Sequence, residues 1–389
     1  MSLEDLQSQL KKDTTREANN RLKPEYRPHV EMGATNGTAA TGLVSTSLIG
    51  NDDDLLRLAG LDPAEWCLDA GSKKIWCHTD DDDKRSIYFG FHKRNKDDAV
   101  SAWLAAPFKG VEPVHDAPCE GLPLIVCLAD MQTGKAGEAY GGTMELIERC
   151  ENILGQLKAL CERERPREIV VADLGDICEG TNNHTSTSQV STNDLPQSEQ
   201  LRVAGRILME YVTTLAPLCA HLTLAGVRSN HGEERLANGQ VNGAGDWGVA
   251  LIKTIGDAIE LLGGGFRERV TVLTEQPLAH GLALEVEGVH IAMLHGHYAK
   301  KVTKLGDWVA QQAGGIRDTI YRDATTVIHG HFHHLTVQES RGRVIYGCPA
   351  LECGSDWLTR SNGEYSNPGV LTLRVKDGRT CGLRIFEQE

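Results

Sequence analysis

The sequence predicts an α/β fold for most of this 389-residue chain. Short apolar runs alternate with longer segments of helical periodicity, and polar residues follow each run. The length also exceeds that of a usual single domain, which favours more than one unit. Strands are expected at 124–129, 168–172, 221–227, 289–294, 325–328, 343–346 and 370–375. Helices are expected at 143–164, 197–215 and 246–262, the last with an aspartate cap and three glycines as a stop.

The N-terminal part of the chain has a different composition. Residues 1–50 are rich in Thr, Asn, Gly, Ser and charged residues, which is typical of a mobile arm. A small α+β module is expected at 51–110, with a helix near residue 55 and strands at 74–78 and 86–91. A connector containing proline and glycine then leads to the main domain, expected at 120–389.

Charge and hydropathy exclude some classes of function. A net charge of -14 argues against a protein that coats nucleic acid by charge alone, because such binding needs Lys and Arg. The negative charge does not exclude a nuclease, since bound metal ions bring their own positive charge. The longest apolar runs are too short to span a bilayer, and the N-terminus has no apolar signal region. We therefore expect a cytoplasmic protein with no membrane segment.

Eleven cysteines are scattered along the chain without a C-x-x-C pair, so we interpret them as reduced thiols. Cys67, Cys77, His78 and His92 form the one alternative, a small zinc site. Their spacing fits no zinc-finger pattern, which makes buried thiols the favoured interpretation.

Polar clusters follow the five central strands at their C-terminal ends, where open α/β sheets bind ligands. Because residues two apart in an extended segment point the same way, Asp130 and Gln132 can share one cation. Gly175 permits a tight turn that presents Asp176 as a carboxylate able to bridge two ions. The other clusters are Arg228 to Glu233, His295 to His297 and His329 to His334.

Histidines are concentrated in the same part of the chain. Seven of the fifteen lie between residues 290 and 334, where chance would place about two, and imidazole is a common neutral metal ligand. The sequence therefore predicts a metal site built from strand ends.

The order of these clusters resembles that of the calcineurin-like metallophosphoesterases. The pattern D-x-(H), GD-x-x-(D/E), (G)NH-(D/E), H-G-H and GHxH covers roughly residues 121 to 375. The resemblance implies a two-sheet β-sandwich flanked by helices, two divalent ions, and a hydroxide that bridges them and attacks phosphorus. His231 would be the acid that protonates the leaving oxygen. The implied ligands are Asp130, Gln132, Asp176 and His333 for one ion, and Asp176, Asn230, His295 and His331 for the other.

The chain departs from the family pattern at two positions. Gln132 stands where the family has His, which favours Mn²⁺ or Mg²⁺, with Fe or Zn²⁺ also open, and predicts a weakly bound first ion. The carboxylate that usually follows the catalytic His is displaced, so Glu233 or Glu234 could orient His231. Whether His295 or His297 is the ligand also stays open.

Three further residues are candidates near the site. Arg228 and His184, the latter in the polar stretch 181–194, are expected to contact substrate, although an ordinary flexible loop explains that stretch equally well. Lys135, in Thr133-Gly134-Lys135, suggests a phosphate-binding loop, but the spacing of such a loop is absent and a solvated lysine explains the residue at least as well.

Smaller features indicate the substrate. The runs 130–135, 141–146 and 61–66 are similar to SbcD-like DNA repair nucleases encoded by bacteriophages. This resemblance implies a phosphodiesterase that cleaves DNA, with the N-terminal module engaging DNA or a protein partner. A small-molecule phosphodiesterase or nucleotidase and a non-catalytic, metal-stabilised binding protein are the alternatives.

Overall fold

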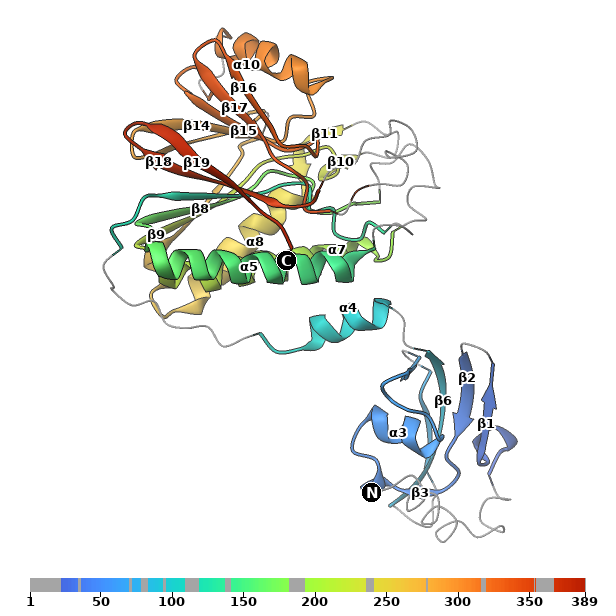
Figure 1. Cartoon of the computed structure of the whole chain (residues 1–389). Helices are drawn as coiled ribbons and strands as arrows, with labels where there is room; N and C mark the ends of the chain where they lie inside the picture. Colours follow the sequence, from blue (N-terminus) through green and yellow to red (C-terminus); the bar gives the residue numbers. More distant parts are fainter. Residues whose placement is uncertain are drawn as a thin grey trace. The chain divides into compact units, whose positions relative to one another are not determined.

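A computed structural model describes residues 22–33, 36–69, 72–77, 83–93, 96–108, 119–136, 141–181, 193–235, 241–277, 279–315, 320–352, 354 and 367–388. The chain divides into two compact units, Met1–Trp103 and Leu104–Glu389. Each unit is described by itself (Figure 1). The predicted α/β class is confirmed, with several sheets and flanking helices.

The first unit is built around β6 (Lys84–Lys93), which pairs antiparallel with four other strands. These are β2 (Asn36–Ala40), β3 (Val44–Ser45), β4 (Trp66–Leu68) and β5 (Lys74–Cys77). On its other side β2 pairs with β1 (His29–Met32). The unit also contains η1 (Pro24–Tyr26), η2 (Thr46–Leu48) and α3 (Asp52–Leu58), and its core includes Leu55, Leu56, Trp66, Phe89 and Phe91.

The expectation of an arm reaching residue 50 is wrong for residues 29–32, 36–40 and 44–45, which form β1, β2 and β3. Their composition hides the strands, because β2 contains glycine and alanine where a large side chain could not fit. A Cβ atom at Gly37 would lie 2.6 Å from the ring of Phe91. The glycine therefore leaves room for an aromatic core residue. Residues 1–21 of the expected arm lie outside the described residues.

The second unit contains two main sheets. The first has the order β12-β9-β8-β7-β18-β19. Its strands β12, β9, β8 and β7 are parallel to one another, and β18 pairs antiparallel with both β7 and β19. Its strands are β7 (Leu124–Leu128), β8 (Glu168–Asp173), β9 (His221–Gly226), β12 (Val270–Thr274), β18 (Val370–Lys376) and β19 (Arg379–Phe386).

The second main sheet has the order β13-β14-β15-β17-β16, with β14, β15 and β17 parallel. Its strands are β13 (Leu282–Val286), β14 (Val289–Leu294), β15 (Thr326–His329), β16 (Thr336–Ser340) and β17 (Arg343–Gly347). A separate antiparallel pair is formed by β10 (Glu233–Arg235) and β11 (Val241–Asp246).

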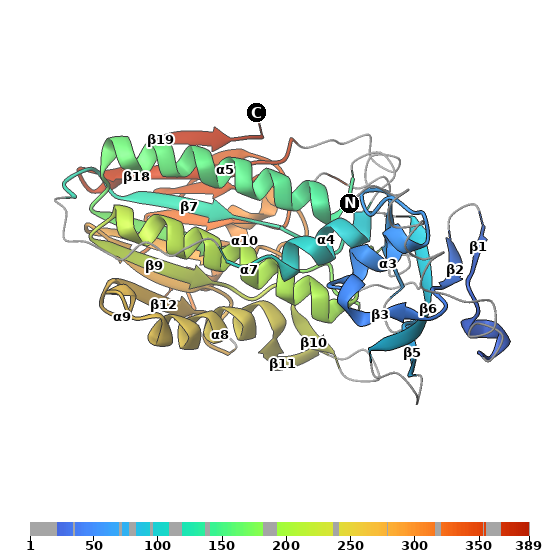
Figure 2. The same cartoon turned by 90° about the horizontal axis from the view of Figure 1, so that it is seen from below.

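Side chains from both main sheets share one hydrophobic core, to which Val170 and Leu371 contribute from the first sheet and Ile291 and Ile328 from the second. Helices cover the opposite face of the first sheet (Figures 1 and 2). They are α5 (Thr143–Glu164), α7 (Gln197–Leu215) and α8 (Trp247–Leu262). The second sheet packs its other face on α10 (Leu305–Ala313). Shorter elements of this unit are η3 (Ala216–Leu218), α9 (Phe266–Arg269) and η4 (Val302–Lys304), and the boundary between the two units falls within α4 (Lys96–Ala105).

The predicted helices and central strands agree with the structure to within one or two residues at each end. The cap expected at Asp246 is confirmed, because its Oδ1 accepts a hydrogen bond of 2.9 Å from the main-chain nitrogen of Val249. Among the described residues, none of the helices has the length and apolar character needed to cross a membrane.

Candidate metal centre

The candidate site lies where both main sheets present the C-terminal ends of parallel strands. Loops after β7, β8 and β9 carry Asp130, Asp176 and Asn230, and loops after β14 and β15 carry His295 and His331. The first two loops are joined through their main chains. The main-chain nitrogen of Asp130 donates to the Gly175 carbonyl over 3.1 Å, and the main-chain nitrogen of Gln132 donates to the Asp176 carbonyl over 2.8 Å.

The backbone of these loops is strained. Five of the ten described non-glycine residues with positive φ are predicted ligands: Asp130, Gln132, Asp176, His331 and His333. Each such conformation costs about 1–3 kcal/mol and persists where the surrounding structure enforces it, often at functional sites. Gly175 has a φ of 91°, and a Cβ atom there would lie 2.6 Å from Ser229. A glycine is therefore required beside Asp176.

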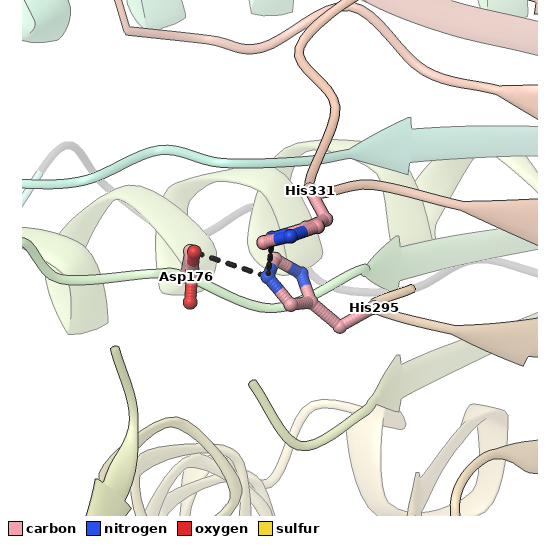
Figure 3. A group of neighbouring side chains, drawn as sticks. All are labelled: Asp176, His295 and His331. Carbon is pink, nitrogen blue, oxygen red and sulfur yellow. Dashed lines mark hydrogen bonds and ion pairs between the residues drawn. The ribbon is translucent and has the colours of Figure 1, made fainter. Parts of the chain in front are cut away.

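Three side chains converge at the centre of the site (Figure 3). His295 Nε2 lies 3.0 Å from Asp176 Oδ2, 3.2 Å from His331 Nδ1 and 2.9 Å from Asn230 Oδ1. Because His295 Nδ1 donates to the Leu174 carbonyl over 2.8 Å, the neutral ring has no proton on Nε2. In the neutral ring, electron pairs from several atoms would face one another, so either a proton on Nε2 or a bound cation must lie between them.

The charges of these groups shift one another's pKa values. Burial disfavours a charged His295, yet the Asp176 carboxylate outweighs burial and raises the pKa of His295 to about 9. Burial also raises the pKa of Asp176, but His295 and His231 together hold it well below its usual range. Burial and the His295 charge lower the pKa of His331 to about 3. A divalent ion can replace the proton of His295, so Asp176, Asn230, His295 and His331, here termed the second ligand group, fit a metal ion.

The first ligand group, Asp130, Gln132, Asp176 and His333, is less tightly gathered. Asp130 Oδ1 is buried and forms an ion pair of 3.2 Å with His333 Nε2; burial acts to lower the pKa of His333, but Asp130 and Glu352 raise it to about 10. Asp130 Oδ2 accepts a 2.8 Å bond from the His331 main chain. Among the described residues, the cluster of three or more potential ligands is Asp176, His295 and His331.

Gln132 is already in contact with a positive charge. Lys135 Nζ donates to Gln132 Oε1 over 2.6 Å and lies 3.3 Å from Glu352 Oε2. The Lys135 side chain is 18% exposed, so the expectation of a solvated lysine is wrong. The side chain folds back over the loop because Glu352, which is buried, needs a countercharge.

Glu352 is a residue that sequence reasoning missed. Its Oε1 accepts a 2.9 Å bond from His333 Nδ1, which turns His333 Nε2 toward Asp130. Burial acts to raise the pKa of Glu352, but Lys135 and His333 lower it to about 2. Glu352 follows the strand expected at 343–346, so the rule that located the other clusters could have found it.

His231 lies beside Asp176, whose Oδ1 accepts a 2.9 Å bond from the His231 main chain. His231 Nδ1 donates to the Glu179 carbonyl over 2.7 Å, and the Glu179 carboxylate lies 3.7 Å from the same atom. His231 Nε2 lies 4.0 Å from Asp176 Oδ2. Glu179 therefore orients the ring, a role for which the sequence offered Glu233 or Glu234. Glu233 instead lies 3.3 Å from Arg235 and 3.7 Å from His297.

The structure distinguishes His295 from His297. His295 belongs to the central cluster, whereas the His297 ring lies 3.9 Å from that of Tyr298. Both His297 nitrogens are buried and lack a hydrogen-bond partner in the described part of the chain. Burial lowers the pKa of His297, which keeps the ring neutral. His295 is thus the candidate ligand, with His297 beside it.

Of the two residues predicted to contact substrate, the structure describes Arg228 and not His184. Arg228 is 7% exposed, and its guanidinium donates to the Gly245 carbonyl over 3.1 Å. Its main chain donates to Glu275, whose pKa burial raises to about 7. His184 lies outside the described residues. A substrate role for either residue stays a prediction.

No family model and no curated protein matches the chain. Among solved structures, a novel archaeal phosphodiesterase has 12% identity and a TM-score of 0.32, covering 68% of this chain and 99% of its own. Zinc-complexed Vps29 from Entamoeba histolytica gives the same four values. A predicted phosphoesterase from Streptococcus pneumoniae has 9% identity, a TM-score of 0.27, and coverages of 68% and 97%. Likeness at this level carries no functional argument, so function must be inferred from the site.

Proposed function

We propose that this chain is a metal-dependent phosphodiesterase. The observation that carries the proposal is the convergence of Asp176 Oδ2, His295 Nε2 and His331 Nδ1 around one point, with Asn230 Oδ1 alongside. A carboxylate, an amide oxygen and two imidazoles form a mixed donor set suited to a divalent transition metal. The dense main-chain bonding beneath them holds this geometry before any ion arrives.

The full form of the proposal has two divalent ions, with Mn²⁺ preferred and Mg²⁺, Fe or Zn²⁺ possible. The second ligand group would hold one ion, and Asp130, Gln132, Asp176 and His333 the other. Bound ions would neutralise charge on the phosphate oxygens and lower the pKa of a bound water. Two sheets that share a core are compatible with the two-sheet sandwich of the metallophosphoesterase fold, which we include in the proposal.

His231 is the proposed acid. Its Nδ1 is held by the Glu179 carbonyl, so the ring presents Nε2 on the side of Asp176. When Nε2 is protonated, it can donate to the leaving oxygen. No protein nucleophile is required. Cys178 in the same loop is buried, and burial raises the pKa of its thiol to about 12, which excludes a reactive thiolate at neutral pH.

We propose DNA as the substrate, in an SbcD-like nuclease that is cytoplasmic and encoded by a phage. A diester carries one negative charge, so it depends less on a tightly bound first ion than a dianionic monoester does. The contact between Lys135 and Gln132 supports this argument, because it disfavours a second full cation nearby. The first unit would engage DNA or a protein partner.

A substrate panel tests this function. Single-stranded DNA, duplex DNA, cyclic nucleotides and a phosphopeptide should be assayed side by side in Mn²⁺ with wild type and Asp176→Asn. We expect DNA cleavage by wild type alone. Cleavage of cyclic nucleotides with DNA intact would favour a small-molecule phosphodiesterase or nucleotidase, and metal binding without turnover of any substrate would favour a non-catalytic binding protein.

A further inference from the structure

The first unit holds a second cluster of reactive side chains, formed by Cys67, His92 and Asp69. Cys67 lies in β4 and His92 in β6, and Asp69 follows the end of β4. The Cys67 thiol was expected to be buried, but it is only half-buried. The His92 and Asp69 side chains are 30% and 43% exposed. A solute can therefore reach the cluster.

Strand pairing places the thiol against the imidazole. Cys67 and His92 are direct partners in the antiparallel register of β4 and β6, so their side chains lie on the same face of the sheet. Cys67 Sγ lies 3.1 Å from His92 Nε2. The main-chain oxygen of His92 is a more distant acceptor at 3.7 Å. The ring nitrogen is therefore the nearer group to receive the thiol proton.

Asp69 sets the orientation of that ring. His92 Nδ1 lies 2.5 Å from Asp69 Oδ1, and since a carboxylate only accepts, Nδ1 carries the proton. Nε2 is then left as the acceptor that faces Cys67. The arrangement of a nucleophile, a base and a group that orients the base is the one that activates cysteine in enzymes.

A glycine makes this contact sterically possible. Asp69 lies opposite Gly90. The main-chain nitrogen of Asp69 donates a hydrogen bond of 3.0 Å to the Gly90 carbonyl. A Cβ atom at Gly90 would lie 2.3 Å from Asp69 Oδ2, so any other residue would displace the carboxylate. Ser72 fixes the same turn, because its hydroxyl donates to the Asp69 carbonyl and accepts from the Gly90 nitrogen.

We propose that Cys67 is a reactive thiol that undergoes exchange with small disulfides, with His92 as its base and Asp69 as the residue that positions His92. This site is independent of the metal centre and of the proposed phosphodiesterase activity. The substrate class is a low-molecular-weight disulfide, for which glutathione disulfide is the probe.

The exchange step is balanced without a further reagent. The Cys67 proton passes to His92 Nε2, and the thiolate attacks one sulfur of glutathione disulfide. A bond between Cys67 and that sulfur forms while the original disulfide bond breaks. The departing glutathione thiolate takes the proton from His92. Cys67 is oxidised and one half of the reagent is reduced.

Other thiols of the same chain provide internal standards. Cys119 and Cys381 are half-buried, as Cys67 is, and Cys119 lies 3.6 Å from the Leu218 carbonyl rather than beside an imidazole. Cys161 and Cys219 are buried, and burial raises the pKa of their thiols above the usual range. Exposure alone would therefore give Cys67, Cys119 and Cys381 similar rates.

The test is a time course of the full-length protein with glutathione disulfide at neutral pH, in which peptide mass spectrometry measures the mixed disulfide at each cysteine. We expect Cys67 to react at least about tenfold faster than Cys119 and Cys381. His92→Ala should reduce that ratio to near one, and added imidazole should restore much of it. His29→Ala, which changes another histidine of the same unit, should leave the ratio unchanged.

Equal rates at the three thiols in wild type would overturn the proposal, as would a His92→Ala protein that keeps the fast rate. Failure of imidazole to rescue a slow, folded His92→Ala variant would assign His92 a structural role instead. Zinc that copurifies with the protein, blocks Cys67 and is lost in Cys67→Ser would make the cluster a metal site. All these outcomes can be read in a chain that has no nuclease activity.

Discussion

The ammonium group of Lys135 lies 2.6 Å from the side-chain oxygen of Gln132, the residue that stands where a histidine ligand was expected. An ion bound by Gln132 would have to share that oxygen with an existing positive charge. A unit charge and a divalent ion about 5 Å apart repel by about 7 kcal/mol at an effective dielectric constant of about 20, before the neighbouring carboxylates are counted. The two ligand groups should therefore bind metal with unequal affinity, and the first group should be the weaker.

Lys135→Met should increase the affinity of the first ligand group for its ion, because the substitution removes this repulsion while keeping most of the side-chain volume. We expect the affinity for the second equivalent of Mn²⁺ to rise by roughly tenfold or more, with the tight equivalent little changed. Isothermal titration calorimetry measures both. Lys158→Met, at an exposed helical lysine, is the matched control. Unchanged or weaker binding of the second equivalent in Lys135→Met would contradict this account.

Asp176→Asn and His231→Ala should separate metal binding from acid catalysis. Asp176 contacts the central cluster directly, so its amide variant should lose turnover and loosen bound metal. His231 contributes its main chain and Nε2 to the site without joining the cluster. His231→Ala should keep the metal and slow turnover by a factor of about 100 to 10,000. Equal loss of metal in both variants, measured by elemental analysis, would show that His231 is a ligand.

The metal-free protein should lose stability as pH rises from 6.5 to about 9. The folded-state pKa of His295 is raised from 6.5 to about 9, so its stabilising contribution is full below pH 6.5 and is lost as pH approaches 9. Burial raises the pKa of Asp173 to about 8, and the ionisation of this group acts in the same direction.

The melting temperature in chelator, followed across this pH range, measures the effect. Saturating Mn²⁺ should remove the decline, because the ion takes the place of the His295 proton and binds more tightly as that proton leaves. A melting temperature that rises with pH in chelator would show that the proton on His295 does not stabilise the fold.

The protein should hydrolyse bis(p-nitrophenyl) phosphate faster than the p-nitrophenyl monoester. A monoester carries an additional negative charge and needs both cations, whereas the first ligand group is weakened by Lys135. The ratio of the two kcat/KM values measures this preference. Lys135→Met should shift it toward the monoester, and a wild-type preference for the monoester would contradict the argument.

The sequence predicted the strands that are buried on both faces and missed those at sheet edges. Strands β7, β8 and β9 are central and read as continuous apolar runs. The missed strands β12, β13, β16 and β19 all lie at edges of the two main sheets. Their residues are mostly half-buried or exposed, so no apolar run marks them.

The site could be predicted to a similar extent. Because parallel strands end at the same edge of a sheet, the strand-end rule located Asp130, Asp176, Asn230 and His295 from sequence alone. The same rule could have found Glu352, but it could not have found the contacts that these side chains make. Lys135 and Glu352 meet although they are far apart in the chain, and Glu179 orients His231 through its main chain. Such contacts depend on side-chain and loop geometry that no local pattern encodes.

If the proposed function is correct, divalent metal at the Asp176, His295 and His331 cluster drives phosphodiester cleavage. The most direct measurement is a titration of Mn²⁺ into chelator-treated protein while hydrolysis of bis(p-nitrophenyl) phosphate is recorded. We predict no activity before Mn²⁺ is added, a rise that saturates as the ligand groups fill, and no rise in Asp176→Asn. Hydrolysis that persists in chelator, or that never appears with Mn²⁺ or another divalent ion, would contradict the account.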